Sequence, residues 1–328
     1  MRYRKLAGGT GPEVSTLCLG ALPFGTTVGE ETAFAILDRF TEAGGTFVDT
    51  SDNYACWVNG ATGDESELVL GRWLRSRRAR DRVVIASKVG ARPDLSRGPL
   101  WCDTAPDGFG NMEGLSAEAV RAGAEGSLRR LGTDHLDLHY AHIEDPSVPL
   151  EETVTAFAGL VAAGRTRLLG VSNHPVARIA EARRLAAELD LPGYQCVQQR
   201  HTYLRPAPGA GFGVQRHTDA ALLDYAAGEP DLTLLGYSVL VHGAYTRDDR
   251  ELLPQYAHRG AERRLRVLRE VAGELGATPN QVVLAWLLGG EVPVLPVLGV
   301  SSVGQLDELL AAADLDLDAE LRARLDAA

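Results

Sequence analysis

The sequence predicts a (β/α)8 TIM barrel, an α/β fold in which parallel strands close into a ring inside a layer of helices. Short apolar segments alternate with longer amphipathic segments about eight times along the 328 residues. Such alternation implies parallel strands joined by crossover helices. The length suits a single barrel domain over residues 1–328, and a hydrophobic content of 45% can fill its core.

The predicted strands are short segments rich in apolar and β-branched residues, as expected of strands buried in a parallel sheet. The run Val83-Val84-Ile85 is typical of them. The predicted strands span residues 17–20, 46–49, 82–87, 135–139, 167–171, 194–197, 232–235 and 293–297.

The segments between these strands carry apolar residues at helical spacing. In 30–43, Phe34, Leu37 and Phe40 lie on one face, and glycines follow the last turn. Ser116 is an expected N-cap, and Gly132 ends the helix that it begins. The predicted helices span residues 30–43, 65–75, 116–131, 150–163, 176–189, 217–227, 261–275, 279–288 and 303–313.

The remaining segments are expected at the two ends of the barrel. Residues before position 17 should form a short β-hairpin under it, with Gly8 and Gly9 at the turn. The longest loops, 90–115 and 200–216, each follow a predicted strand. Both should therefore lie over the C-terminal face, where barrels of this kind build their active sites.

Composition excludes several classes of function. The formal charge of −11 gives no basic surface for nucleic acid, so none is expected as a partner. Four widely spaced cysteines contain no C-x-x-C pair, which argues against structural zinc or a disulfide framework. The N-terminus lacks the apolar stretch of a signal peptide, and no apolar run could cross a bilayer. We expect a cytoplasmic protein that does not bind membranes.

Three patterns suggest ligands that we do not expect. His135, His139 and His142 are close in sequence, but His142 has the opposite strand parity and no carboxylate has a suitable spacing, so no metal is expected. The glycine-rich stretch 8–11 is expected to be a turn, and 159–166 should be part of a helix, so neither predicts a phosphate-binding loop.

Polar residues with complementary chemistry follow three successive predicted strands. Asp49 and Tyr54 follow the second, Lys88 the third and His142 the fourth. A tyrosine can donate a proton to a carbonyl oxygen, and a nearby lysine should lower its high pKa. An aspartate can hold the lysine, and a histidine can orient the substrate or share the proton. Each residue has a purely structural alternative, and two other histidines compete, but the joint arrangement favours carbonyl reduction.

The motifs around these residues resemble those of the aldo-keto reductases. FVDTSDNY at 47–54, VIASK at 84–88 and LGTDHLDLHYAH at 131–142 are similar to the family's stretches around its catalytic Asp and Tyr, Lys and His. The likeness selects His142 and runs from about residue 6 to residue 315. It implies a reductase of aldehydes or ketones that uses NAD(P)H, with Tyr54 as proton donor.

The resemblance also implies a site for NADP(H) or possibly NAD(H). LGVSN at 169–173 is similar to the stretch that holds the nicotinamide carboxamide, and GYS at 236–238 to the one whose Tyr stacks on the ring. Ser301 stands where the family often has a basic residue for the 2′-phosphate, so the preferred cofactor stays open. The implied cofactor-binding residues are Gly20, Ala21, Ser172, Asn173, Gln198, Tyr237, Ser238, Leu240, Gly299, Ser301, Gln305 and Glu308.

The substrate stays open beyond a small-molecule carbonyl compound, as does the oligomeric state. One alternative is a reductase of nucleotide-linked keto-sugars, whose phosphates loop arginines such as Arg92 could bind. Another is a subunit that senses the cofactor without turnover. The candidate walls of the substrate pocket are Trp57, Trp101, Phe109 and His201.

Overall fold

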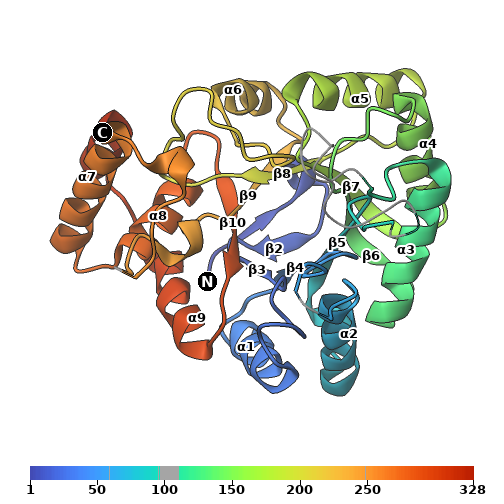
Figure 1. The fold of residues 1–328 in the computed structure, drawn as a ribbon, viewed down its shortest axis with the longest axis horizontal. Helices are drawn as coiled ribbons and strands as arrows, with labels where there is room; N and C mark the ends of the chain where they lie inside the picture. The colour runs from blue at the N-terminus through green and yellow to red at the C-terminus, as the bar shows by residue number, and fades with distance from the viewer. Residues whose placement is uncertain (59, 95, 97–110, 248) are drawn as a thin grey trace.

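A closed barrel of parallel strands forms the centre of the protein (Figure 1). The computed structural model describes residues 1–58, 60–94, 96, 111–247 and 249–328. Each barrel strand pairs in parallel with both neighbours, and β10 beside β3 closes the ring. The (β/α)8 prediction is confirmed. The barrel strands are β3 (Cys18–Gly20), β4 (Phe47–Asp49), β5 (Val84–Val89), β6 (Leu136–Ala141), β7 (Thr166–Ser172), β8 (Cys196–Arg200), β9 (Thr233–Tyr237) and β10 (Val294–Gly299).

Helices surround the barrel, and their ends carry the capping residues that the sequence contains. Ser116 caps α3 by accepting from the amide of Ala119, and Gly132 ends it in a left-handed conformation. The helices are α1 (Glu30–Glu42), α2 (Glu65–Arg77), α3 (Ala117–Leu131), α4 (Leu150–Ala162), α5 (Val176–Glu188), α6 (Ala220–Gly228), α7 (Arg259–Leu275), α8 (Pro279–Leu288), α9 (Val303–Leu310) and α10 (Ala319–Ala327).

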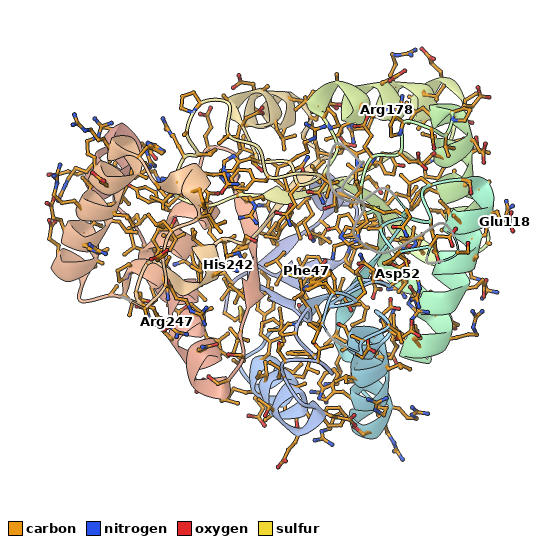
Figure 2. The ribbon with its side chains drawn as sticks, in the orientation of Figure 1. Phe47, Asp52, Glu118, Arg178, His242 and Arg247 are labelled. Carbon is orange, nitrogen blue, oxygen red and sulfur yellow. The ribbon has the colours of Figure 1, made fainter. Side chains whose placement is uncertain are left out.

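The predicted hairpin is present and closes the lower end of the barrel. Strands β1 (Tyr3–Lys5) and β2 (Glu13–Ser15) pair antiparallel. Leu6 and Val14 are fully buried and belong to the cluster that fills the barrel interior. The second, larger cluster lies between the strands and the surrounding helices. Phe47, inside the ring of helices in Figure 2, belongs to the interior, whereas the exposed Glu118 points outward from α3.

Element boundaries differ from the prediction where polar residues decide them. Strand β8 runs to Arg200, not to residue 197, because its register against β9 continues through Gln198 and Gln199. Helix α6 starts at Ala220 and not at residue 217, because Asp219 caps it by accepting from the amide of Leu222. Helix α10 was not predicted.

Buried histidines make the folded state sensitive to acid. His139 of β6 packs against Phe157 of α4, with ring centroids 5.7 Å apart, and burial lowers its pKa to about 4. The unfolded chain, with an ordinary pKa near 6.5, therefore binds more protons below that value. The contribution of the neutral His139 to the free energy of unfolding is therefore fully present above about pH 6.5, and it is lost as the pH falls toward 4.

Between pH 7.5 and pH 4, the free energy of unfolding should fall by about 3 kcal/mol less in His139→Leu than in the wild type. This follows from about 1.4 kcal/mol for each unit by which the pKa is shifted. Urea unfolding of both proteins at a series of pH values measures it. His258→Leu, at the partly exposed start of α7, is the matched control. An equal pH dependence in wild type and His139→Leu would contradict the prediction.

Candidate active site

Three neighbouring strands bring the four predicted catalytic residues to one end of the barrel. Asp49 ends β4, Tyr54 lies in the loop that follows, and Lys88 lies near the end of β5. His142 comes directly after β6, and its backbone amide donates to the carbonyl of Val89 at 2.9 Å. The strands β4, β5 and β6 are adjacent in the barrel, so sequence order becomes spatial order.

Asp49, Tyr54 and Lys88 form a closed triangle of polar contacts. Lys88 Nζ lies 2.5 Å from Asp49 Oδ1 and 2.5 Å from the Tyr54 hydroxyl. The Tyr54 hydroxyl donates to Asp49 Oδ1 at 3.0 Å. Lys88 also donates to the carbonyl of Thr50 at 2.8 Å. All three side chains are buried, with Tyr54 the most exposed at 8%.

The pKa of Tyr54 is shifted opposite to our expectation. We expected Lys88 to lower it, but burial raises it well above its ordinary value, and Asp49 raises it further. Burial also lowers the pKa of Lys88, against the opposing effect of Asp49. Taking charge out of water favours the neutral form of each group. Tyr54 is therefore a neutral phenol at physiological pH and has a proton to give.

His142 lies beside Tyr54 and is held by a residue that the sequence analysis did not single out. The two rings meet edge to face with centroids 6.1 Å apart. His142 Nδ1 lies 3.1 Å from Ser51 Oγ. Burial, with Lys88 adding to it, lowers the pKa of His142 well below its ordinary value. The imidazole is therefore neutral at physiological pH.

The residues predicted to hold the nicotinamide lie together on the next strands. Ser172 ends β7 opposite Gln198 in the register of β7 and β8. Asn173 donates to Ser172 Oγ at 3.0 Å and accepts from the Tyr237 hydroxyl at 2.7 Å. Gln198 Nε2 donates to Asp49 Oδ2 at 2.8 Å, which joins this group to the triangle.

Two further residues position this group, and the sequence analysis missed both. Gln199 Oε1 accepts from the backbone amide of Asn173 at 2.9 Å. Arg200 donates twice to Gln215, at 3.0 and 2.7 Å, and its guanidinium lies 5.8 Å from the centre of the Tyr237 ring. The available signal was that both are polar residues at the C-terminal end of a strand.

The predicted adenosine end is held by its own hydrogen bonds. Gln305 Oε1 accepts from the amide of Ser301 at 2.8 Å and from its hydroxyl at 3.1 Å. Glu308 instead reaches the start of α8, where Thr278 and Asn280 donate to it. Gly299 ends β10, and its neighbour in register, Gly20, ends β3. The other predicted contacts, Ala21, Ser238 and Leu240, follow the ends of β3 and β9.

Comparison with known sequences agrees with this geometry. The sequence model of the aldo/keto reductase family matches residues 16–328. The chain belongs to this family. It is therefore an oxidoreductase of a family whose general chemistry is carbonyl reduction and which generally uses NAD(P)H.

Several curated relatives are oxidoreductases of the same family type. An uncharacterized oxidoreductase, YrpG of Bacillus subtilis (strain 168), is 32% identical over 98% of this chain and 94% of its own length. The norsolorinic acid reductase stcV of Emericella nidulans is 32% identical over 97% of this chain and 79% of its own. An aryl-alcohol dehydrogenase of Pestalotiopsis microspora, GME11368, is 27% identical over 97% of this chain and 80% of its own length.

Among the predicted pocket walls of this aldo-keto reductase, Trp57 lies in the loop between β4 and α2. It lies three residues after Tyr54 and is 45% exposed. Trp101 and Phe109 lie outside the described residues. His201 is buried, with its ring 5.9 Å from Trp286 of α8 and 5.7 Å from His217. Its role as a pocket wall stays a prediction.

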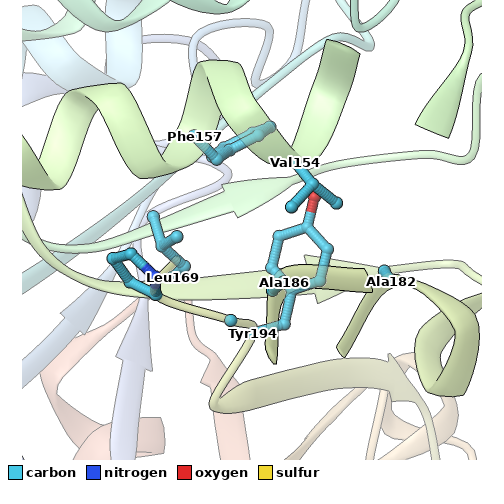
Figure 3. A pocket seen from close by; sticks show the side chains of 8 residues that line it. Val154, Phe157, Leu169, Ala182, Ala186 and Tyr194 are labelled. Atoms are coloured by element: carbon cyan, nitrogen blue, oxygen red, sulfur yellow. The ribbon is translucent and has the colours of Figure 1, made fainter. Parts of the chain in front are cut away.

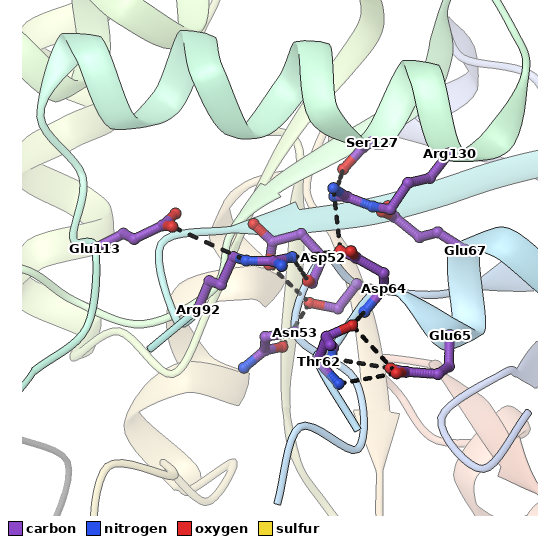
Figure 4. A network of polar contacts seen from close by, with 12 residues as sticks. Asp52, Asn53, Thr62, Asp64, Glu65, Glu67, Arg92, Glu113, Ser127 and Arg130 are labelled. Atoms are coloured by element: carbon purple, nitrogen blue, oxygen red, sulfur yellow. Dashed lines mark hydrogen bonds and ion pairs between the residues drawn. The ribbon is translucent and has the colours of Figure 1, made fainter. Parts of the chain in front are cut away.

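A network of charges fixes the loop that carries Tyr54 (Figure 4). Arg92 donates to the carbonyl of Asp52 and to Asp64, both at 2.7 Å. Arg130 contacts Asp64 at 3.3 Å and Glu67 at 2.7 Å. Arg92 was a candidate for binding the phosphates of a sugar nucleotide. Because it is already paired, the structure does not favour that role.

A small gap beside α4 and α5 (Figure 3) is lined by apolar side chains such as Phe157, Leu169 and Tyr194. Within the described residues, no group of three or more His, Cys, Asp or Glu could hold a metal ion. Nor does any helix in those parts of the chain have the length and apolarity needed to cross a membrane.

Proposed function

We propose that this protein reduces aldehydes or ketones to alcohols with NAD(P)H, and that Tyr54 donates the proton. The observation that carries the proposal is the buried triangle of Tyr54, Lys88 and Asp49. When bound, NAD(P)H supplies the hydride. Tyr54 then gives its proton to the carbonyl oxygen, and the ammonium of Lys88, 2.5 Å away, stabilises the phenolate that remains.

The donor set beside the triangle suits a nicotinamide carboxamide. A primary amide both donates and accepts, so it needs one acceptor and one donor. Ser172 Oγ accepts from Asn173, which leaves its own proton to donate. Gln198 uses its Nε2 on Asp49, which leaves its amide oxygen to accept. The partly exposed ring of Tyr237, held by Asn173, offers a flat surface for the nicotinamide.

An aromatic substrate is the form of carbonyl compound that we favour. Trp57, three residues after Tyr54 in the sequence, presents a large exposed ring. The aryl-alcohol dehydrogenase among the relatives acts, by its name, on an aryl alcohol, which is what reduction of an aromatic carbonyl compound would yield. Trp101 and Phe109 stay candidates for the remaining walls.

The experiment is cofactor oxidation by the wild-type protein with 4-nitrobenzaldehyde, an activated aromatic aldehyde. We expect turnover that requires both the aldehyde and the reduced cofactor. Tight cofactor binding without turnover on any simple aldehyde or ketone would contradict the proposal. It would favour either a keto-sugar nucleotide substrate or a cofactor-sensing role.

The adenosine end predicts weak discrimination between the two cofactors. Ser301 and Gln305 are both uncharged and bind each other, so no charge-assisted bond to a 2′-phosphate forms there. We expect Ser301→Arg to lower the KM for NADPH by roughly tenfold or more, the value of one bond to a charged group. The KM for NADH should change little.

Steady-state kinetics with both cofactors measures this difference. Ser301→Gln, which adds length without charge, is the matched control. A Ser301→Arg variant in which both KM values move together would show that position 301 does not face the phosphate.

A further inference from the structure

Arg200, the last residue of β8, is a buried positive charge. Its side chain is almost sealed from solvent, and the residue is 5% exposed. Its Nε and Nη2 donate to Gln215 Oε1, at 3.0 and 2.7 Å, but glutamine carries no charge. Among the residues that the structure describes, no Asp or Glu forms an ion pair with Arg200. A guanidinium stays charged when it is buried, so the protein keeps a charge here without an opposite partner.

Two aromatic rings lie against the guanidinium and hold it in place. Its Cζ is 4.7 Å from the centre of the Phe212 ring and 5.8 Å from the centre of the Tyr237 ring. The backbones of Arg200 and Tyr237 are also neighbours in the register of β8 and β9. The π-electrons of a ring stabilise a cation that has left water, but they do not cancel its charge. The positive charge therefore stays fixed beside Tyr237.

This charge acts on its surroundings more strongly than an exposed charge would. Solvent and salt screen exposed charges, and they screen buried charges much less. Its effect reaches Tyr237, whose pKa is raised by burial and lowered by Arg200. Lys88 and Asp49 of the triangle have opposite charges and are paired, so they largely cancel. Arg216, whose amide donates to Asn173, is exposed, and water screens its side chain.

We infer that Arg200 makes the cofactor site prefer the reduced cofactor over the oxidised one. The inference rests on the proposed function, because that proposal places the nicotinamide on the ring of Tyr237. The nicotinamide of NAD(P)H is neutral, whereas that of NAD(P)⁺ carries a positive charge. A fixed cation beside Tyr237 therefore repels the oxidised ring and leaves the reduced ring unaffected. Arg200 selects between the two redox forms by charge alone.

The size of the preference follows from the distance. Stacked rings have centres about 4.5 Å apart, so a nicotinamide on Tyr237 comes within roughly 10 Å of the guanidinium. Two unit charges about 10 Å apart, at an effective dielectric constant of about 20, change a binding constant by roughly tenfold. We expect Arg200 to raise the ratio of the Kd for the oxidised form to the Kd for the reduced form by this factor.

The benefit of this charge lies in product release. Oxidised cofactor is a product of carbonyl reduction, and a site that binds it less tightly releases it sooner. The same repulsion makes hydride transfer within the complex less favourable, so the chemical step itself gains nothing. Arg200 is thus a residue that determines specificity for the redox state of the cofactor. It is not a catalytic residue.

The test measures cofactor binding and needs no turnover. Isothermal titration calorimetry with NADPH and NADP⁺, and again with NADH and NAD⁺, gives the ratio of the two Kd values for each protein. The two redox forms differ only in the nicotinamide, so a general loosening of the site raises both Kd values and leaves their ratio unchanged. Arg200→Gln removes the charge, and we expect the ratio to fall by roughly tenfold.

Gln215→Glu neutralises Arg200 without removing it. The glutamate keeps the acceptor oxygen for Nε and Nη2 and adds a negative charge at the same place. We expect the same fall in the ratio, together with a higher Tm, because the buried cation gains an opposite partner. This variant keeps the test decisive even if Arg200→Gln folds poorly.

Arg264→Gln is the matched control. Arg264 of α7 is 2% exposed, and its guanidinium lies 4.1 Å from the centre of the Tyr203 ring. The substitution therefore removes a buried cation from an aromatic ring outside the proposed cofactor site. It should leave the ratio of the two Kd values unchanged, whatever it does to stability.

The outcomes separate this inference from the proposed function. A ratio that is unchanged in Arg200→Gln and Gln215→Glu would overturn the inference, as would an equal fall in Arg264→Gln. Either result is compatible with reduction of aldehydes and leaves the proposed function intact. The expected ratios in a protein that reduces no carbonyl compound would instead support the role of Arg200 and overturn the proposed reduction. Failure to bind either redox form would overturn both.

Discussion

Tyr54→Phe should lower kcat for aldehyde reduction by about a hundred- to ten-thousand-fold, the usual contribution of a positioned general acid. The variant loses only a hydroxyl. Lys88 keeps Asp49 and the carbonyl of Thr50 as partners, so the buried cation stays paired. The loss should therefore fall on proton transfer and not on folding. Stopped-flow or steady-state oxidation of the reduced cofactor measures it.

A matched control isolates the hydroxyl of Tyr54 from the general effect of removing a buried phenol. Tyr194→Phe alters a tyrosine that is 4% exposed and lies beside the apolar gap near α5. It should keep wild-type turnover. Cofactor binding, followed by quenching of tryptophan fluorescence, should be similar in all three proteins. Undiminished turnover in Tyr54→Phe would assign the proton donor elsewhere.

The pH dependence of the reduction offers an independent check on Tyr54. Because burial and Asp49 raise its pKa above the ordinary value near 10, the phenol stays protonated well into the alkaline range. The rate of reduction should therefore not fall between about pH 7 and 9 through loss of this proton. A decline centred near neutrality would show that Lys88 dominates after all.

Lys88→Met should reduce the free energy of unfolding by about 3–5 kcal/mol and also abolish most turnover. The pair of Lys88 and Asp49 is fully buried, with exposures of 1% and 0%. Removing one partner leaves the other charge buried without compensation, which is far costlier than removing both. Among the described residues, Asp49 would keep its side-chain hydrogen bonds from Tyr54 and Gln198. Urea denaturation at pH 7.5 measures the change.

The double variant Asp49→Asn/Lys88→Met separates stability from chemistry. It contains no isolated charge, so it should recover most of the lost stability while staying inactive. Equal stability of the single and double variants would mean that the buried carboxylate is tolerated without its partner. Recovery of turnover in the double variant would show that the lysine is not needed for proton transfer.

The sequence predicted the elements well because their signals are local. Alternating apolar segments predicted the barrel, and Ser116 and Gly132 marked the ends of α3 correctly. Caps and periodicity act over a few residues, so they are legible without the fold. The end of β8 was predicted too early, at residue 197 and not at Arg200, because the polar residues Gln198 and Gln199 interrupt the apolar pattern there.

In the candidate site, too, some properties could be predicted from the sequence and others could not. Asp49, Tyr54, Lys88 and His142 could be named from motifs, since strand ends that are adjacent in order become adjacent in a barrel. The direction of the Tyr54 pKa shift could not be predicted from the sequence, because it depends on how completely the fold removes water from the triangle of Asp49, Tyr54 and Lys88.

The sequence by itself thus determined the barrel, the order of its strands and the residue types at their ends. Only the tertiary structure decided which polar atoms are already paired, as Arg92 is with Asp64 and His142 with Ser51. Pairing depends on contacts between segments far apart in sequence and on distances of a few tenths of an ångström. These distances exist only after the chain has folded, and they set the donor and acceptor roles on which the proposed chemistry depends.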